Sequence, residues 1–80
     1  MKIERVISWF DRSTEELLGE LNIDNINLEI LKAIFKPEAE DPLMYNPYTI
    51  NAEEANKLKK VIDIQFDLEH FFYQVDCFQI

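Results

Sequence analysis

Residues 70–79 constrain the fold of this chain more than any other stretch. They read HFFYQVDCFQ, are rich in aromatic and β-branched residues, contain no glycine or proline, and therefore predict a β-strand. One face of this strand is apolar and carries Phe71, Tyr73, Val75 and Cys77, and the other is mixed and carries Phe72, Gln74, Asp76 and Phe78. A lone strand cannot satisfy its backbone, so we expect it to pair with residues 2–10 at the other end of the chain.

Residues 2–10 predict the second strand, with apolar side chains on both faces. Ile3, Ile7 and Trp9 share one face, and Val6 and Phe10 share the other. We expect one face to pack on helices. The second face is then partly covered by Phe72 and Phe78 or by another chain.

Three helices are predicted between these strands. Ser13 opens a Ser-Thr-Glu-Glu capping box and starts a helix over residues 14–22, with the apolar stripe Leu17, Leu18 and Leu21. A second helix follows residues 23–27 and runs to about residue 36, where Pro37 ends it. The clearest helix covers residues 51–64, with Asn51 as its cap and Glu54 three residues later.

Together these elements predict one α+β domain over residues 1–80 with the order β-α-α-α-β. Its small sheet consists of the N- and C-terminal strands packed against three helices. We expect the two strands to be antiparallel, although a long helical crossover also permits parallel strands.

Residues that carry chemistry are few. His70 is the only histidine, so neither an oriented general base nor a histidine-rich metal site is indicated. Cys77 lies on the predicted inner face and is typical of a buried apolar thiol. A single glycine excludes phosphate-cradling and dinucleotide loops. We expect no catalytic residues, no cofactor and no metal, and therefore not an enzyme.

The charge indicates the class of partner. Sixteen acidic residues against eight basic ones give a net charge of −8, which disfavours nucleic acid and anionic membranes. The charge favours a basic protein partner, or it serves solubility alone. The N-terminus lacks the apolar core of a signal peptide, no run of about 20 apolar residues is present, and one cysteine cannot form an internal disulfide, so we expect a cytoplasmic protein.

Two acidic groups are candidate partner-binding residues. The irregular stretch 36–50 is as often a packed connector as a binding loop, and it holds Glu38, Glu40, Asp41, Tyr45 and Tyr48. The outer side of the first predicted helix holds Glu15, Glu16 and Glu20. The first two of these also fit ordinary complementarity to a helix N-terminus.

The two ends of the chain resemble a group of known proteins. The start is RVISWFD (residues 5–11) leading into a Ser-Thr cap, and the end is FYQVDCFQ (residues 72–79). With the length and acidity, they resemble small uncharacterised bacterial proteins and the immunity proteins of contact-dependent growth inhibition and related polymorphic toxin systems. The resemblance covers the whole chain and implies a cytoplasmic, non-catalytic protein that blocks a toxin domain, often a nuclease. It transfers no binding motif to numbered positions.

An acidic inhibitor associates quickly with a basic nuclease, and tyrosines are good buried anchors. We therefore expect the acidic and tyrosine residues of 36–50 to form part of such a surface, with the acidic first helix as second choice. Charge reversal in 38–41 is then expected to slow association at low salt. The alternative is a non-catalytic dimeric assembly module, in which an open edge along residues 2–10 or 70–79 pairs with a second copy. A nucleic-acid mimic uses the same charge, and an enzyme is the weakest alternative.

Overall fold

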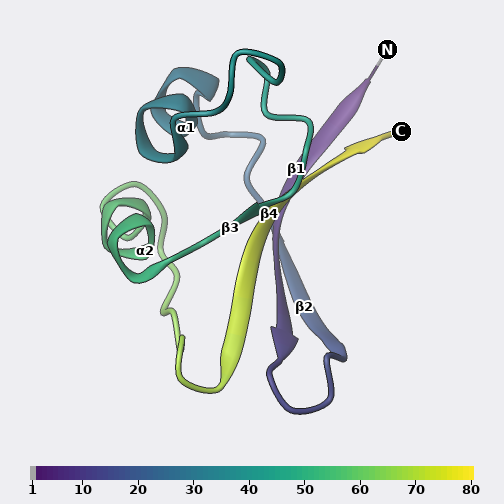
Figure 1. Cartoon of the computed structure of the whole chain (residues 1–80), viewed down its shortest axis with the longest axis vertical. Helices are drawn as coiled ribbons and strands as arrows, with labels where there is room; N and C mark the ends of the chain where they lie inside the picture. The colour runs from purple at the N-terminus through teal and green to yellow at the C-terminus, as the bar shows by residue number, and fades with distance from the viewer. Residues whose placement is uncertain (1) are drawn as a thin grey trace.

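The computed structural model describes residues 2–80, and Met1, the first residue of the predicted domain, lies outside them. The elements in chain order are β1 (Ile3–Asp11), β2 (Leu17–Asn22), α1 (Leu28–Phe35), β3 (Tyr48–Thr49), α2 (Ala52–Leu58) and β4 (Phe71–Gln79). The strands form one antiparallel sheet of order β2-β1-β4-β3. Both helices lie on the same side of this sheet (Figure 1).

The expected pairing of the two terminal strands is confirmed. All nine residues of β1 face β4 in antiparallel register, from Ile3 opposite Gln79 to Asp11 opposite Phe71. This ladder forms the centre of the sheet, because β2 pairs with the free side of β1. Of the two open edges that the dimeric alternative named, the one along residues 2–10 is therefore covered by β2 from Val6 to Phe10. The one along residues 70–79 is paired with β3 only at Gln74 and Val75.

The predicted β-α-α-α-β arrangement is wrong. The described residues contain four strands and only two helices, and the segment predicted as the first helix forms β2. The Ser-Thr-Glu-Glu box lies in a turn instead of a helix cap. Asp11 Oδ1 accepts hydrogen bonds from Ser13 N at 2.7 Å and Thr14 N at 3.0 Å, and Glu15 adopts a positive φ of 62°. This turn reverses the chain and returns it along β1. A single short helix is only marginally stable by itself, so strand pairing with β1 overrides the local helix preference.

Gly19 explains why β2 fits beside β1. Gly19 lies opposite Trp9, and a Cβ built on it would overlap with Trp9 Cζ2. The indole ring thus occupies the space that any side chain at position 19 would need. A bulge follows between Trp9 and Phe10, and it brings Leu17 opposite Phe10.

Helices are confirmed at the other two predicted positions, although the one expected over residues 51–64 is shorter than predicted. Asn27 caps α1, and Lys36 ends it in the left-handed conformation just before Pro37. The capping box of Asn51 and Glu54 starts α2. That helix stops at Leu58, because the next apolar residues follow a period of two and pack on the core from an extended chain: Ile62, Ile64, Phe66 and Leu68.

The core lies between the helices and one face of the sheet. This inner face contributes Ile7, Tyr73 and Val75, each 4% exposed or less. The helices and loops complete the same cluster with Ile23, Leu31, Phe35, Met44, Ile50, Ala55 and Leu58. Within residues 2–80, no helix is long and apolar enough to cross a membrane.

Candidate functional site

The predicted binding loop is organised around Asp41, which is only 8% exposed. Its Oδ1 accepts a hydrogen bond from Tyr45 N at 2.8 Å. Its Oδ2 accepts from Asn46 N at 3.1 Å and from the Tyr48 hydroxyl at 2.6 Å. The carboxylate thus closes a turn of its own loop and has little surface left for a partner.

These contacts shift both ionisable groups. The hydrogen bond from Tyr48 and those from the two backbone amides lower the pKa of Asp41, against the opposing effect of burial. Burial, followed by the adjacent Asp41 carboxylate, raises the pKa of Tyr48 to about 12. Tyr48 also packs on Phe35, with ring centroids 5.9 Å apart, so its ring contributes to the fold.

The other loop candidates lie at the surface. Glu38 and Glu40 are exposed, and Tyr45 is 43% exposed. Tyr45 borders a shallow hollow of about 220 Å³ with Ile3, Cys77, Phe78 and Gln79. The structure thus joins Asp41 and Tyr48 by a direct bond and leaves Glu38 and Glu40 beside them as solvated charges.

The second acidic group lies elsewhere. Glu15 and Glu16 belong to the turn between β1 and β2, and Glu20 lies in β2 opposite Ser8. Figure 1 places this turn and the 36–47 loop at opposite ends of the sheet. The two predicted acidic groups therefore do not form one surface.

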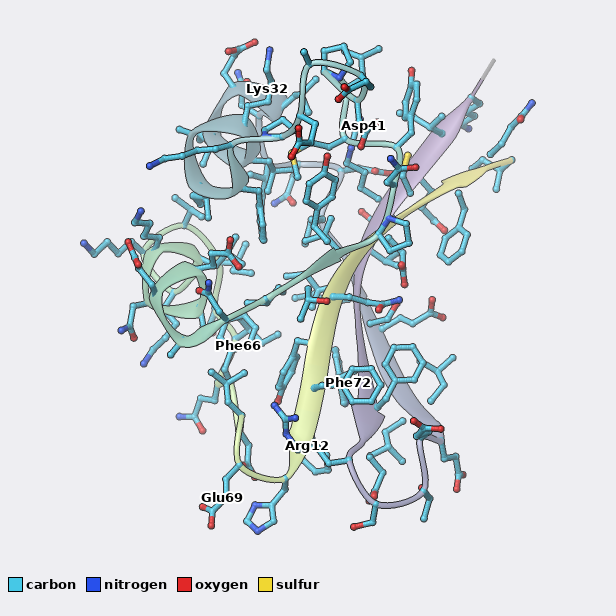
Figure 2. The ribbon with its side chains drawn as sticks, viewed as in Figure 1. Arg12, Lys32, Asp41, Phe66, Glu69 and Phe72 are labelled. Atoms are coloured by element: carbon cyan, nitrogen blue, oxygen red, sulfur yellow. The ribbon has the colours of Figure 1, made fainter. Side chains whose placement is uncertain are left out.

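A different surface emerges from the sheet itself, on the face that points away from the helices. Figure 2 shows Phe72 on this side of β4 and Phe66 on the helix side. Strand alternation and the pairing register of β1, β2 and β4 place eleven residues of these three strands there, which we call the open face: Glu4, Val6, Ser8, Phe10, Leu17, Glu20, Asn22, Phe72, Gln74, Asp76 and Phe78. The hydrogen bond from Asn22 Nδ2 to Glu4 Oε2 at 3.2 Å runs across it.

One end of the open face is apolar. The rings of Phe10 and Phe72 stack across β1 and β4 with centroids 4.8 Å apart and an angle of 13° between planes. Leu17, opposite Phe10, is 50% exposed. Toward the other end, Phe78 is 44% exposed. The face thus presents apolar area to solvent on both sides of its centre.

The centre of the open face is a buried polar group. Ser8 Oγ donates to Asp76 Oδ2 at 2.8 Å, and Gln74 Nε2 donates to Asp76 Oδ1 at 2.8 Å and to Oδ2 at 3.1 Å. Ser8 is 1% and Asp76 8% exposed, although no helix covers this face. Among residues 2–80, no basic side chain forms an ion pair with Asp76.

The side chains that could carry chemistry are engaged with neighbouring groups. Ser8 bonds to a carboxylate and has no histidine beside it to act as a base. The one histidine, His70, pairs with Asp67 at 2.9 Å at the surface and lowers the pKa of that carboxyl group. In the part of the chain that the structure describes, no three His, Cys, Asp or Glu side chains gather as a metal site.

The sequence predictions missed Ser8, Phe10, Leu17 and Asp76 as site residues. The available signal was the apolar alternation of residues 2–10 and 70–79 on both faces, which exceeds what one covered face needs. The helix predicted over residues 14–22 removed β2 from the sheet, so Leu17 and Glu20 were not placed beside Phe10 and Ser8.

The sequence has a recognisable family. No curated protein matches the chain. One family model, a domain of unknown function (DUF7683), matches residues 4–76, which extend from β1 into β4 and include both helices. The match spans most of the chain and nearly all of the open face. The chain therefore belongs to the DUF7683 family.

Proposed function

We propose that this protein is a non-catalytic binding domain that holds a basic domain of another protein on its open face, and that it acts as an immunity protein neutralising a toxin domain. A single observation carries the proposal. The open face combines exposed apolar side chains with carboxylates and has no helix over it.

The apolar part of the open face supports a protein partner. The core of this domain already lies on the other side of the sheet, so Phe10, Phe72 and Leu17 do not join it. Exposed apolar patches rimmed by polar groups mark interaction surfaces, and aromatic side chains are frequent anchors of interfaces. The Phe10–Phe72 stack provides a flat, preordered anchor of this kind.

Charge supports a basic partner. Three residues of the open face are carboxylates, Glu4, Glu20 and Asp76, and none of its eleven members is basic. The whole chain carries a net charge of −8. A partner with positive charge is attracted over a distance and docks faster, especially at low salt.

The toxin part of the proposal rests on the resemblance of the two chain ends to immunity proteins. Nuclease toxins hold phosphate with basic residues, so an acidic inhibitor suits their active sites. Under this proposal the inhibitor covers the toxin's substrate site and performs no chemistry.

The loop residues named from the sequence remain a competing surface within the same function. Glu38 and Glu40 are solvated there, whereas Asp41 and Tyr48 are occupied by each other. Reversing one charge on each surface distinguishes them. We expect Glu20→Lys to slow association at low salt, and we expect Glu38→Lys to change it much less.

The test is a binding measurement with the purified C-terminal domain encoded immediately upstream of this gene. Isothermal titration calorimetry at low and moderate salt, with wild type and Phe72→Ala, measures the affinity. Leu43→Ala is the matched control, because Leu43 is equally apolar and 43% exposed but lies in the 36–47 loop. We expect salt-sensitive binding that Phe72→Ala weakens by roughly tenfold or more and Leu43→Ala leaves within about threefold.

Two results contradict the proposal. Absence of binding, together with failure to protect cells from that domain, removes the immunity function. Equal binding by wild type and Phe72→Ala, with loss on Glu38→Lys, transfers the interface to the loop.

The dimeric alternative retains two strand edges, β2 and the part of β4 outside Gln74 and Val75, the two residues that pair with β3. β2 is an edge strand, and its six residues have no partner on the side away from β1 among residues 2–80. A second copy can add there, but each copy brings a charge of −8 and Glu20 lies in that strand. Light scattering decides: a dimer mass that Glu20→Pro abolishes favours assembly through β2, and a monomer mass removes it.

A further inference from the structure

We infer that Asp76 receives an arginine side chain of the partner, held against the ring of Phe78. This inference rests on the proposed function, because it specifies the chemistry of the same open face.

The first step is the state of the Asp76 carboxylate. It accepts three hydrogen bonds, all from neutral donors, the Ser8 hydroxyl and the Gln74 amide. Two carboxylate oxygens have about four acceptor positions, and Oδ1 uses only one of its pair here. Among the described residues, no cation balances this largely buried charge. A cationic donor from another protein can bond to the free acceptor position and also balance the negative charge.

The second step is the surroundings of Asp76. Val6 lies opposite Asp76, and Phe78 lies two residues further along the same face of β4, about 7 Å away. Glu4 lies opposite Phe78, so a second carboxylate stands diagonally across from Asp76. The 44% exposed ring of Phe78 thus lies beside two carboxylates. A flat cation can stack on this ring while it bonds to a carboxylate.

The third step selects arginine. A guanidinium is planar, stacks on aromatic rings and bonds carboxylates in a two-pronged manner. An ammonium group from lysine is strongly hydrated and loses more on entering a site that is 8% exposed.

The fourth step concerns a second copy of this chain as the donor. The chain has two arginines, and each donates one hydrogen bond to its own backbone: Arg5 Nη2 to Leu43 O at 2.6 Å and Arg12 Nε to Leu68 O at 2.8 Å. The other guanidinium nitrogens can still donate, but each copy carries a net charge of −8, so two copies repel each other. This charge favours a different, basic protein as the partner that supplies the arginine.

The test uses a probe that does not require the partner. Titration of ¹⁵N-labelled protein with N-acetyl-arginine amide, with N-acetyl-lysine amide as control, reports which backbone amides sense the cation. We expect saturable shifts in residues 74–78 and 6–8 with the arginine probe, several-fold weaker shifts with lysine, and loss of saturation in Asp76→Asn. Asparagine preserves the shape and the bond from Ser8. Phe78→Ala, at an exposed position, provides a second variant that is expected to fold and to weaken binding about threefold to tenfold.

The same variants then separate this inference from the proposed function. With the upstream-encoded domain, Asp76→Asn is expected to weaken binding at least about 30-fold, and Glu20→Gln, a solvated carboxylate on the same face, by less than about threefold. Binding lost in Phe72→Ala but unchanged in Asp76→Asn overturns the arginine site and leaves the binding function intact. Arginine-probe shifts that persist in Asp76→Asn, or that spread equally over all acidic surfaces, also overturn the site. Saturation at residues 74–78 without binding of the upstream domain supports the site and contradicts the choice of partner.

Discussion

The two faces of this sheet come from the same strands, yet they differ in what covers them. On the inner face, Ile7 and Val75 are fully buried beneath α1, α2 and the connecting loops. On the open face, the neighbouring residues Phe10 and Phe72 stack on each other and face solvent in part. Because the side chains alternate, each strand contributes almost equally to a core and to an exposed surface.

This difference separates what folds the domain from what the domain can bind. An 80-residue chain has one modest core, and here its connected cluster of buried side chains lies on the inner face. Val6 is the one apolar residue of the open face that is buried. Phe10 and Phe72 are half-buried there, whereas Leu17 and Phe78 are exposed. The Asp76 carboxylate in the middle of the open face requires two side chains to satisfy it. Under the proposed function the open face serves recognition, and this distinction can be measured.

The largest expected effect is on the inner face. Leu58 is completely buried between α2 and the sheet, and Leu58→Ala removes its side chain without a group to fill the space. We expect a loss of about 2–5 kcal/mol in the free energy of unfolding, measured by urea denaturation. Phe78→Ala on the open face is the control. If it destabilises the protein as much as Leu58→Ala, then the two faces do not differ as described.

The second effect tests the edge of the inner face, where β2 meets the ring of Trp9. Gly19→Ala places a methyl group against Trp9 Cζ2, so we expect a loss of about 1–3 kcal/mol in the free energy of unfolding by overpacking. Loss of glycine flexibility in the unfolded chain opposes this by only about 0.4–1 kcal/mol. In a Trp9→Phe background the penalty is expected to fall, and a double-mutant cycle measures the coupling. An additive cycle would show that the ring does not confine position 19.

Part of the fold was predictable from the sequence. The pairing of residues 2–10 with 70–79 was predictable, because both segments are rich in strand-forming side chains. The starts of α1 and α2 were predictable from the caps Asn27 and Asn51. The strand β2 was not, because its leucines and its Ser-Thr cap also fit a helix. Its true partner, the ring of Trp9, lies ten residues earlier and appears in no local pattern.

The candidate site was predictable only in part. A mixed outer face on the C-terminal strand was visible in the alternation of Phe72, Gln74, Asp76 and Phe78. The sequence did not show which of the three loop carboxylates, Glu38, Glu40 or Asp41, is buried. Which carboxylate turns inward depends on the path of the loop, and here that path directs the amides of residues 45 and 46 at Asp41.

A smaller effect is expected on the open face. Phe72→Ala removes a stacked ring that is already partly exposed, so we expect a loss of about 1–2 kcal/mol in stability, of which the stack contributes about 0.5–1.5 kcal/mol. Thermal and urea unfolding measure it. At a temperature where both variants are folded, we expect Phe72→Ala to lose more affinity for the partner than Leu58→Ala. A reversed order would assign the binding surface to the inner side.

The smallest effect compares two aspartates that are equally buried, Asp41 in the loop and Asp76 on the open face, each 8% exposed. The hydrogen bonds from Tyr48 and the loop amides hold the pKa of Asp41 below its ordinary value of 3.8. Its ionised form is therefore favoured by folding, and its contribution to stability is present above pH 3.8 and is lost as the pH falls through the lowered value. We expect Asp41→Asn to lower the urea midpoint modestly at neutral pH.

The difference between Asp41→Asn and wild type is expected to shrink well below pH 3.8, where both side chains are neutral. Glu40→Gln, next to Asp41 but exposed, controls for net charge and is expected to change the midpoint little at either pH. A pH-independent gap would mean that the loop does not depend on the ionised carboxylate. For binding, we expect Asp76→Asn to cause a larger loss of affinity than Asp41→Asn. Asp41 bonds to its own loop, whereas Asp76 retains an acceptor position for a partner. Equal losses of binding in Asp41→Asn and Asp76→Asn would remove the distinction between a carboxylate that folds the chain and one that recognises another protein.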